Sequence, residues 1–268
     1  MSQIPPLLLV GCGRMGSAML AGWRERGLAA SFAVDPAPEA RRNAGADLTV
    51  VDDLGSVPAG FTPAGIILAV KPQTAAQALP AYARFAGSGV FLSIMAGRTI
   101  GGIQGLVGGT AAIVRAMPNT PAAVRQGITV ATPNAHVTPA QRALCGDLLS
   151  AIGLVEWVDD EALLDPVTAV SGSGPAYVFL LAELMEQAAI EQGIAPDLAR
   201  ILARQTVAGS GALLAASTES AADLRKAVTS PQGTTEAALK VLMAPGAMPA
   251  ALSEAIAAAT IRSRELAG

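Results

Sequence analysis

The stretch LRKAVTSPQGTTEAAL, residues 224–239, has the residue types and spacing of a binding site for a small anion. Pro231 ends one predicted helix, and Gly233 then lets the backbone turn sharply. A second helix begins at Thr234 and Thr235. The start of a helix leaves several N–H groups without partners, and the helix dipole favours negative charge there. Two hydroxyl groups beside those N–H groups form a seat for a small carboxylate.

Two predicted helices must position this loop, and Glu236 is placed to cap the second of them from within its first turn. The same spacing also fits an ordinary helix–loop–helix corner, because short loops of Ser, Thr and Gly are common between helices. We expect the hydride donor that would react with a bound acceptor to lie in the first half of the chain.

A glycine-rich loop follows the first predicted strand, residues 7–10. The loop has the pattern G-x-G-x-x-G, and helical spacing continues over residues 17–26. In this context Gly11 allows the tight turn, Gly13 lets the backbone approach a pyrophosphate, and Gly16 lets the helix pack on the strand. The setting predicts a dinucleotide site.

The second predicted strand, residues 32–34, ends in Asp35. An acidic side chain there can accept hydrogen bonds from the adenosine ribose, which favours NAD. Arg41 and Arg42 lie just beyond and could instead meet the 2′-phosphate of NADP, so the sequence leaves the cofactor open. Asp35 could also be only a turn residue before Pro36.

Alternating strands and helices continue to residue 159 and predict an α/β fold, a Rossmann-like doubly wound parallel sheet. The loop at Lys71 and Pro72 follows one predicted strand, and Ala96 and Gly97 follow the next, where small residues permit contact with a nicotinamide. The predicted strands are 65–70, 90–94, 111–116, 127–131 and 155–158, with a helix at 139–152. Residues 1–159 form the predicted dinucleotide-binding domain.

Residues 160–268 form a predicted all-helical substrate and dimerisation domain, with helices at 161–170, 199–216 and 249–266. Residues 171–177 are predicted to break the helical pattern, with Pro175 at the first position of a new helix that continues through Gln192. That helix is apolar on nearly every side, and such a helix must be buried on every side. We expect this half to build a subunit interface; a self-contained helical bundle is the alternative.

Composition excludes several classes of function. The net charge is −3 and the basic residues are scattered, so we expect no nucleic-acid partner. We find no apolar run long enough to span a membrane and no signal peptide at the N-terminus. Cys12 and Cys145 lie far apart without ligand spacing, which fits a reduced cytoplasm and indicates no metal site. His136 lies in a Pro/Asn-rich loop, where we expect it to be solvated.

The chain as a whole resembles the pyrroline-5-carboxylate reductases, a family that makes proline. The most specific blocks are AVKPQ (69–73), RAMPNTP (115–121), SGSGPAY (171–177), residues 224–239 and the ending IRSREL (261–266). The resemblance implies reduction of L-1-pyrroline-5-carboxylate to L-proline with NADPH or NADH. It also implies a homodimer, which in this family often assembles further into decamers.

The resemblance assigns roles to individual residues. The loop ending in Thr234 and Thr235 would hold the substrate carboxylate through backbone N–H groups and the Thr235 hydroxyl, with Thr235 as the catalytic position. Glu161 matches a position near the substrate ring. The expected substrate-binding residues are Glu161, Ser230, Gly233, Thr234 and Thr235. The expected cofactor-binding residues are Gly11, Cys12, Gly13, Arg14, Met15, Gly16, Asp35, Asp53, Ala69, Val70, Lys71, Pro72, Ala96 and Gly97.

Three positions depart from the family pattern. Asp53 is an uncertain match to a position that often holds Asn near the ribose. Ala227 stands where relatives often carry a polar side chain, which puts a substrate contact from it in doubt. Gln232 stands where glycine is common, and we expect it to be tolerated if its φ angle is negative.

The expected chemistry suits a chain with a single histidine. A protonated cyclic imine is already electrophilic at its C=N carbon, so the enzyme must position it more than supply a strong acid. Two rival hypotheses are a β-hydroxyacid dehydrogenase and a non-catalytic NAD(P)-binding regulatory protein. The dehydrogenases carry a catalytic Lys where this chain has Val178, and the regulatory protein would be expected to have lost the 230–235 loop.

Overall fold

The structure is a computed structural model that describes residues 3–267, and the chain folds into two compact units. The first unit contains Met1–Gly172 and Ala259–Gly268, and the second contains Ser173–Ala258. The predicted domain boundary at residue 159 marks the point where the strand pattern of the sequence ends. The two units are defined by packing instead, so that boundary remains a prediction.

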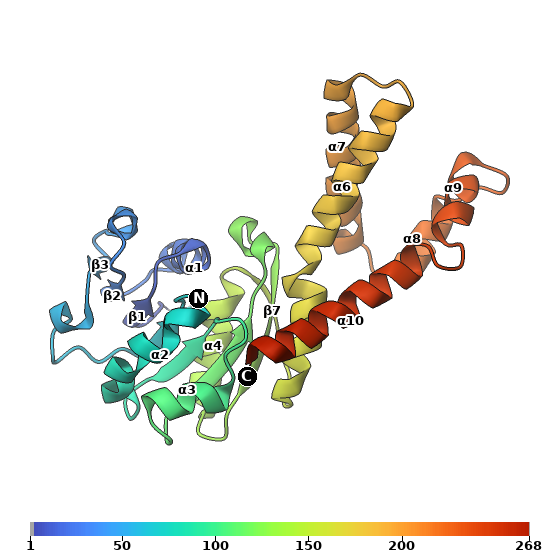
Figure 1. The fold of residues 1–268 in the computed structure, drawn as a ribbon. Helices are drawn as coiled ribbons and strands as arrows, with labels where there is room; N and C mark the ends of the chain where they lie inside the picture. The colour runs from blue at the N-terminus through green and yellow to red at the C-terminus, as the bar shows by residue number, and fades with distance from the viewer. Residues whose placement is uncertain (1–2, 268) are drawn as a thin grey trace. The chain divides into compact units, whose positions relative to one another are not determined.

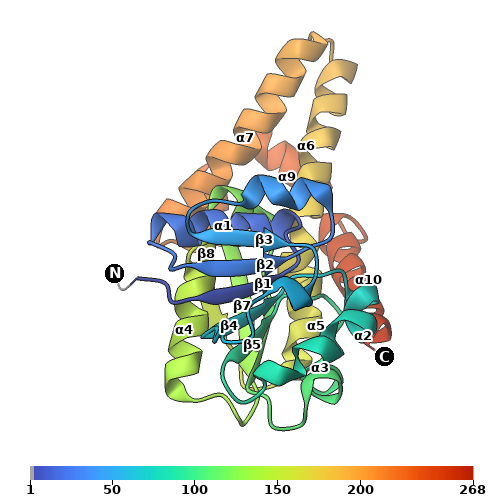
Figure 2. The ribbon, with the colours of Figure 1, turned by 90° about the vertical axis from the view of Figure 1, so that its left-hand side faces the viewer.

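An eight-stranded sheet forms the centre of the first unit, in the order β3-β2-β1-β4-β5-β6-β7-β8. Figure 2 shows β3, β2, β1, β4 and β5 following one another in this order. The strands are β1 (Leu7–Val10), β2 (Ser31–Val34), β3 (Leu48–Val51), β4 (Gly65–Leu68), β5 (Val90–Ser93), β6 (Ile113–Met117), β7 (Gly127–Pro133) and β8 (Gly153–Trp157). The doubly wound α/β fold is confirmed, and β3 is a strand that the sequence pattern did not predict.

The prediction that every strand is parallel is wrong at one place, because β7 runs antiparallel to β6. Only residues 118–126 join these strands, with a 3₁₀ turn at Thr120–Val124. A parallel neighbour needs a crossover of a dozen or more residues, so this short connection reverses the chain. Helix α4 (Pro139–Ser150) then provides a crossover that returns β8 parallel to β7.

Alternate residues of the buried strands build two separate cores, one on each face of the sheet. Leu7 and Leu9 of β1 pack with α1 (Arg14–Glu25) and α4, whose Leu148 carbonyl accepts a 2.9 Å hydrogen bond from the Trp23 indole. Leu8 of β1 packs on the opposite face with α3 (Ile100–Val107) and the 3₁₀ segment Leu79–Phe85. Burial on both faces explains why these strands are continuously apolar.

The second unit is all-helical. Its elements are α6 (Gly174–Glu191), α7 (Pro196–Ala216), α8 (Ala221–Ala227), α9 (Thr234–Leu242) and most of α10 (Met248–Ala267). Figure 1 shows α6 and α7 side by side as a helical hairpin. Many apolar side chains of α6 are exposed in this single chain, including Phe179, Leu180 and Leu184.

The predicted break at residues 171–177 is wrong in extent. A 3₁₀ turn (Glu161–Leu163), α5 (Leu164–Val167) and a π-turn (Thr168–Gly172) lead almost directly into α6, and Tyr177 lies inside that helix. Pro175 does lie in the first turn of α6, where its missing N–H costs no hydrogen bond. The resulting run Glu161–Glu191 is long and apolar enough to cross a membrane by length and composition alone, contrary to expectation.

Candidate active site

The glycine-rich loop joins β1 to α1, and each of its three glycines meets a different constraint. Gly11 has a φ of +96°, and a Cβ there would lie 2.8 Å from the Ala69 carbonyl oxygen at the end of β4. A Cβ at Gly16 would lie 2.6 Å from the Gly11 oxygen. A Cβ at Gly13 would meet no atom within 4 Å. The loop is therefore tight on its inner side and open at Gly13.

The open side of the loop coincides with the start of α1. Gly13 is the N-cap of α1, and no side chain caps this end of the helix. Backbone N–H groups at an uncapped helix start, beside open space, suit a pyrophosphate. The first turn also carries Arg14, which is exposed. These residues fit the phosphates of a dinucleotide cofactor.

Cys12 belongs to this loop through its backbone rather than its thiol. Its side chain is buried, and burial together with the nearby charge of Asp35 raises the pKa of the thiol to about 11. Its N–H group donates a 2.6 Å hydrogen bond to Asp35 Oδ2. The thiol is therefore protonated at neutral pH and has no role as a nucleophile.

Asp35 and Asp53 both lie beyond the carboxyl ends of strands, where the adenosine half of a dinucleotide binds in this fold. The second oxygen of Asp35 accepts a 2.9 Å hydrogen bond from the Ala37 N–H. Asp53 is exposed and caps a short 3₁₀ turn by accepting from the Ser56 N–H at 3.2 Å. Nearby, Arg41 forms an exposed ion pair with Asp52. Asp35 therefore contacts the glycine loop through a side-chain hydrogen bond.

The loops after β4 and β5 carry the remaining predicted cofactor residues. Ala69 and Val70 are half-buried, Lys71 is exposed, and the Pro72 carbonyl accepts a 2.9 Å hydrogen bond from Arg98 Nε. Arg98 thus ties the two loops together, a contact that no sequence motif indicated.

Gly97 is small for a different reason from the predicted one. Its φ is +69°, and a Cβ there would lie 3.1 Å from the Leu266 carbonyl oxygen of α10. The neighbouring Ala96 is exposed and is the member of this pair open to a ligand. Packing against the last helix therefore accounts for the glycine, and a cofactor contact at Gly97 remains a prediction.

Glu161 is held within the first unit. Its Oε1 accepts a 2.8 Å hydrogen bond from the Ile100 N–H, at the start of α3, and another from Arg115 Nη1 at 2.8 Å. The Arg115 side chain is only 6% exposed, so this carboxylate neutralises a buried cation. Arg115 and Ile100 are functional neighbours that sequence reasoning missed, although Arg115 opens the RAMPNTP block. The predicted proximity of Glu161 to the substrate ring stays a prediction.

The loop at residues 228–233 connects α8 to α9, and its turn is closed by the Gly233 N–H donating to the Ser230 carbonyl at 3.1 Å. A Cβ on Gly233 would overlap Ser230 Oγ. Thr234 and Thr235 occupy the first turn of α9, as predicted, and no side chain caps its N-cap residue. The uncapped helix start and the adjacent hydroxyls provide the donors that a carboxylate needs.

Three details of this loop and of the helix before it differ from expectation. Gln232 has a φ of +59°, so the condition under which we expected it to be tolerated is not met. Gly233, with φ −84° and ψ 173°, is extended, so the sharp turn falls on Gln232 instead. Helix α8 also ends at Ala227, before Pro231. Gly233 is required by the closeness of Ser230 and not by an unusual φ angle.

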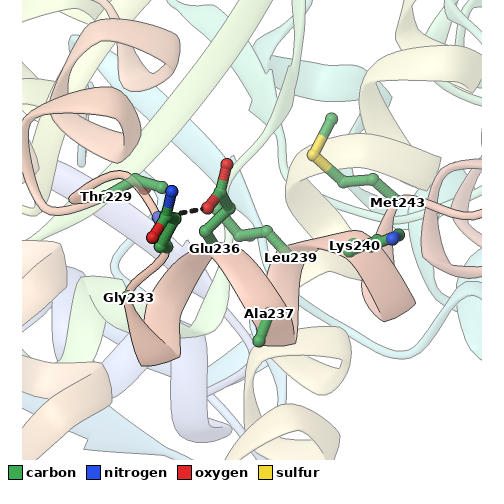
Figure 3. Close-up of a pocket in the computed structure, with 8 residues that line it drawn as sticks. Thr229, Gly233, Glu236, Ala237, Leu239, Lys240 and Met243 are labelled. Atoms are coloured by element: carbon green, nitrogen blue, oxygen red, sulfur yellow. Dashed lines mark hydrogen bonds between the residues drawn. The ribbon is translucent and has the colours of Figure 1, made fainter.

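A cavity of about 570 Å³ lies beside the loop, lined by Thr229, Gln232, Gly233, Glu236, Ala237, Leu239, Lys240 and Met243. Figure 3 shows the lining residues on the loop and along α9, and the dashed line marks the 2.5 Å hydrogen bond from the Gln232 N–H to Glu236 Oε2. Glu236 thus ties the loop to its helix through Gln232, the residue before the N-cap Gly233, and does not cap the helix start itself as predicted. Ser230, Thr234 and Thr235 do not line this cavity.

The predicted site residues therefore form two groups. The cofactor residues and Glu161 belong to the first unit, and the 230–235 loop belongs to the second. Among residues 3–267, no group of three or more His, Cys, Asp or Glu side chains could hold a metal ion.

Comparison with known proteins identifies the family. A family model described as pyrroline-5-carboxylate reductase dimerisation matches residues 161–266. The pyrroline-5-carboxylate reductase of Pseudomonas aeruginosa is 38% identical over 266 residues, covering 98% of this chain and 97% of that protein.

Solved structures agree. A Coxiella burnetii pyrroline-5-carboxylate reductase has a TM-score of 0.89 at 30% identity and covers 99% of both chains. The Plasmodium falciparum pyrroline carboxylate reductase, solved with NADP bound, has a TM-score of 0.85 at 26% identity and covers 100% of both chains. Sequence identity above 30% along nearly the whole chain, joined to the glycine loop and the Ser230–Thr235 turn, places this chain in the pyrroline-5-carboxylate reductase family.

Proposed function

We propose how this chain performs the reaction of its family, the reduction of L-1-pyrroline-5-carboxylate to L-proline by hydride transfer from NAD(P)H. The observation that carries the proposal is the uncapped start of α9, with Thr234 and Thr235 in its first turn. That start forms the seat for the substrate carboxylate. The Thr235 hydroxyl donates to one carboxylate oxygen, and backbone N–H groups after Gly233 donate to the other.

The dinucleotide lies along the carboxyl edge of the sheet in the first unit. The α1 start at Gly13 holds its pyrophosphate, and Asp35 with Asp53 lies at its adenosine end. Ala69 to Pro72 and Ala96 line the nicotinamide half. The cofactor supplies the hydride from C4 of its reduced ring. The NADP bound in the structure of the Plasmodium relative supports the use of a dinucleotide of this kind.

The chain's main chemical task is positioning. The substrate iminium is electrophilic already, so holding its C=N carbon about 3–3.5 Å from the hydride source supplies most of the catalysis. The proton on the ring nitrogen comes from solvent or through a hydroxyl. Glu161 borders the substrate ring while its Oε1 keeps Arg115 and α3 in place.

The chain works as a homodimer through its helical unit, and decamers are the larger assembly to test. The exposed apolar face of α6 supports this, because a partner subunit would remove it from water. Burial against a partner subunit would also explain why the Glu161–Glu191 run is so apolar, with no need for a membrane. We place the enzyme in the cytoplasm, where its two cysteines stay reduced.

Loss of NADH and NADPH absorbance with racemic pyrroline-5-carboxylate tests this function. Rapid oxidation of either cofactor is expected. A folded, cofactor-binding protein that oxidises neither would contradict the function, and hydroxy acids would then test the dehydrogenase hypothesis. Val178 at the position of the dehydrogenase lysine predicts no turnover of hydroxy acids.

A further inference from the structure

The carboxyl ends of β2 and β3 hold an arrangement of charge that bears on the choice between NADH and NADPH. Val34 pairs with Val51 in register, and the Asp35 N–H donates to the Val51 carbonyl at 2.9 Å. Asp35 and Asp52 are therefore the first residues after two neighbouring strands. NADPH differs from NADH only by a phosphate on the adenosine ribose, which binds beyond the end of β2 in this fold.

The Asp35 carboxylate is fixed in place. Its Oδ2 accepts from the Cys12 N–H at 2.6 Å, and its Oδ1 accepts from the Ala37 N–H at 2.9 Å. An acidic side chain free to rotate could turn away from an approaching phosphate. One held by two backbone groups cannot move without breaking both hydrogen bonds, one of which shapes the glycine loop.

Arg41, one of the two arginines that follow β2, already shares its charge with Asp52. Both oxygens of Asp52 accept from Arg41 Nη2, at 2.9 and 2.7 Å. Arg41 lies in the 3₁₀ segment Pro38–Asn43 that follows β2, where an arginine could otherwise meet a 2′-phosphate. The ion pair is exposed, so it weakens the attraction between Arg41 and a 2′-phosphate but does not abolish it.

We infer that Asp35 is the specificity-determining residue for the cofactor and makes this enzyme prefer NADH, with the Arg41–Asp52 pair as a second, smaller contribution. The inference rests on the proposed function and deepens it. The fixed carboxylate accepts hydrogen bonds from the ribose hydroxyls of NADH and repels the two negative charges of a 2′-phosphate. We expect kcat/KM for NADH to exceed that for NADPH by about tenfold or more, a difference of about 1.4 kcal/mol.

Substitutions at three residues, Asp35, Asp52 and Arg41, test the assignment. Asp35→Asn keeps the size and one acceptor oxygen but removes the charge, and should lower the NADH/NADPH ratio about tenfold; Asp35→Ser provides a second variant if the amide disturbs the loop. Asp52→Ala frees Arg41 and should raise kcat/KM for NADPH by up to about fivefold. Arg41→Ala should lower kcat/KM for NADPH. Asp197→Ala, which breaks the exposed Arg200–Asp197 pair of the second unit, is the matched control and should leave the ratio unchanged.

Calorimetric titration of the protein with 5′-AMP and 2′,5′-ADP measures the affinity of the adenosine site for each nucleotide in the absence of turnover. The wild type should bind 5′-AMP more tightly, and the difference should shrink as NaCl is raised, because salt screens charge repulsion. Tighter binding of 2′,5′-ADP, or a ratio unaltered in both Asp35 variants, would overturn the inference. Failure of the proposed function is a separate result. In that case neither NADH nor NADPH is oxidised with pyrroline-5-carboxylate, whatever the affinities for 5′-AMP and 2′,5′-ADP.

Discussion

At the scale of single residues, the substrate loop depends on the absence of one methyl group. A Cβ at Gly233 would overlap Ser230 Oγ and lie 3.0 Å from the Ser230 carbonyl oxygen, so Gly233→Ala must open the turn. We expect this change to raise KM for pyrroline-5-carboxylate at least tenfold in steady-state assays. The affinity for NAD(P)H, measured by fluorescence titration, should change less than twofold.

Gln232→Gly is the matched control for that prediction. Gln232 has a φ of +59°, a conformation that glycine adopts without strain, so this neighbouring change should leave the turn and KM intact. Equal KM values for Gly233→Ala and the wild type would show that the geometry of this turn does not matter to the substrate.

Residue types predicted some of these constraints and missed others. The tight turn at Gly11 and the close packing at Gly16 followed from the motif, whereas the approach of a pyrophosphate to Gly13 stays a prediction. The reason for Gly97 could not be predicted, since Leu266 lies far along the chain. The φ of Gln232 was equally hidden, because nothing in a glutamine signals a left-handed backbone.

At the scale of elements, Glu161 joins the helical run of residues 161–191 to β6 and α3. Glu161→Ala leaves the buried Arg115 without its carboxylate and should lower the unfolding free energy by about 2 kcal/mol, between the values for exposed and buried pairs. Chemical denaturation measures this. Glu161→Gln keeps an acceptor for the Ile100 N–H and should cost less. A stable Glu161→Ala enzyme with a raised KM would instead favour a direct contact with the substrate.

The pair between Arg24 and Asp47 links α1 to the turn before β3 and predicts a pH dependence. The hydrogen bond from Arg24 holds the pKa of Asp47 below its usual value in the folded protein. On acidification the unfolded chain therefore takes up the proton first, so this stabilisation is complete above about pH 4 and is lost as the pH falls further. Asp47→Asn should cost about 1 kcal/mol at pH 7 and less near pH 3. An equal cost at both values would contradict this linkage.

Sequence periodicity predicted most elements and their order, yet β7 was taken as parallel and the helix break at 171–177 as longer than it is. The two errors have different origins. The pattern of apolar residues identifies an element but not its direction, and glycine and proline at a helix start look the same as a loop.

At the scale of the whole molecule, we propose that the second unit packs against a partner subunit. Phe179, Leu180 and Leu184 of α6 are exposed in the single chain, and the family model that covers this region describes dimerisation. Leu180→Glu should keep the helical content seen by circular dichroism but convert the dimer to a monomer in light scattering. Leu154→Glu, at an exposed leucine of the first unit, should leave the dimer intact. A dimer that survives Leu180→Glu would place the interface elsewhere.

We propose that the start of α9 holds the substrate carboxylate, and substitution of Thr235 tests this most directly. We would measure KM for pyrroline-5-carboxylate and the Kd of NAD(P)H for the wild type, Thr235→Ala and Thr235→Ser. Loss of one hydrogen bond to a charged group predicts a KM about 10- to 100-fold higher for Thr235→Ala, a nearly unchanged cofactor Kd, and substantial recovery in Thr235→Ser. Unchanged kinetics in Thr235→Ala would contradict the account.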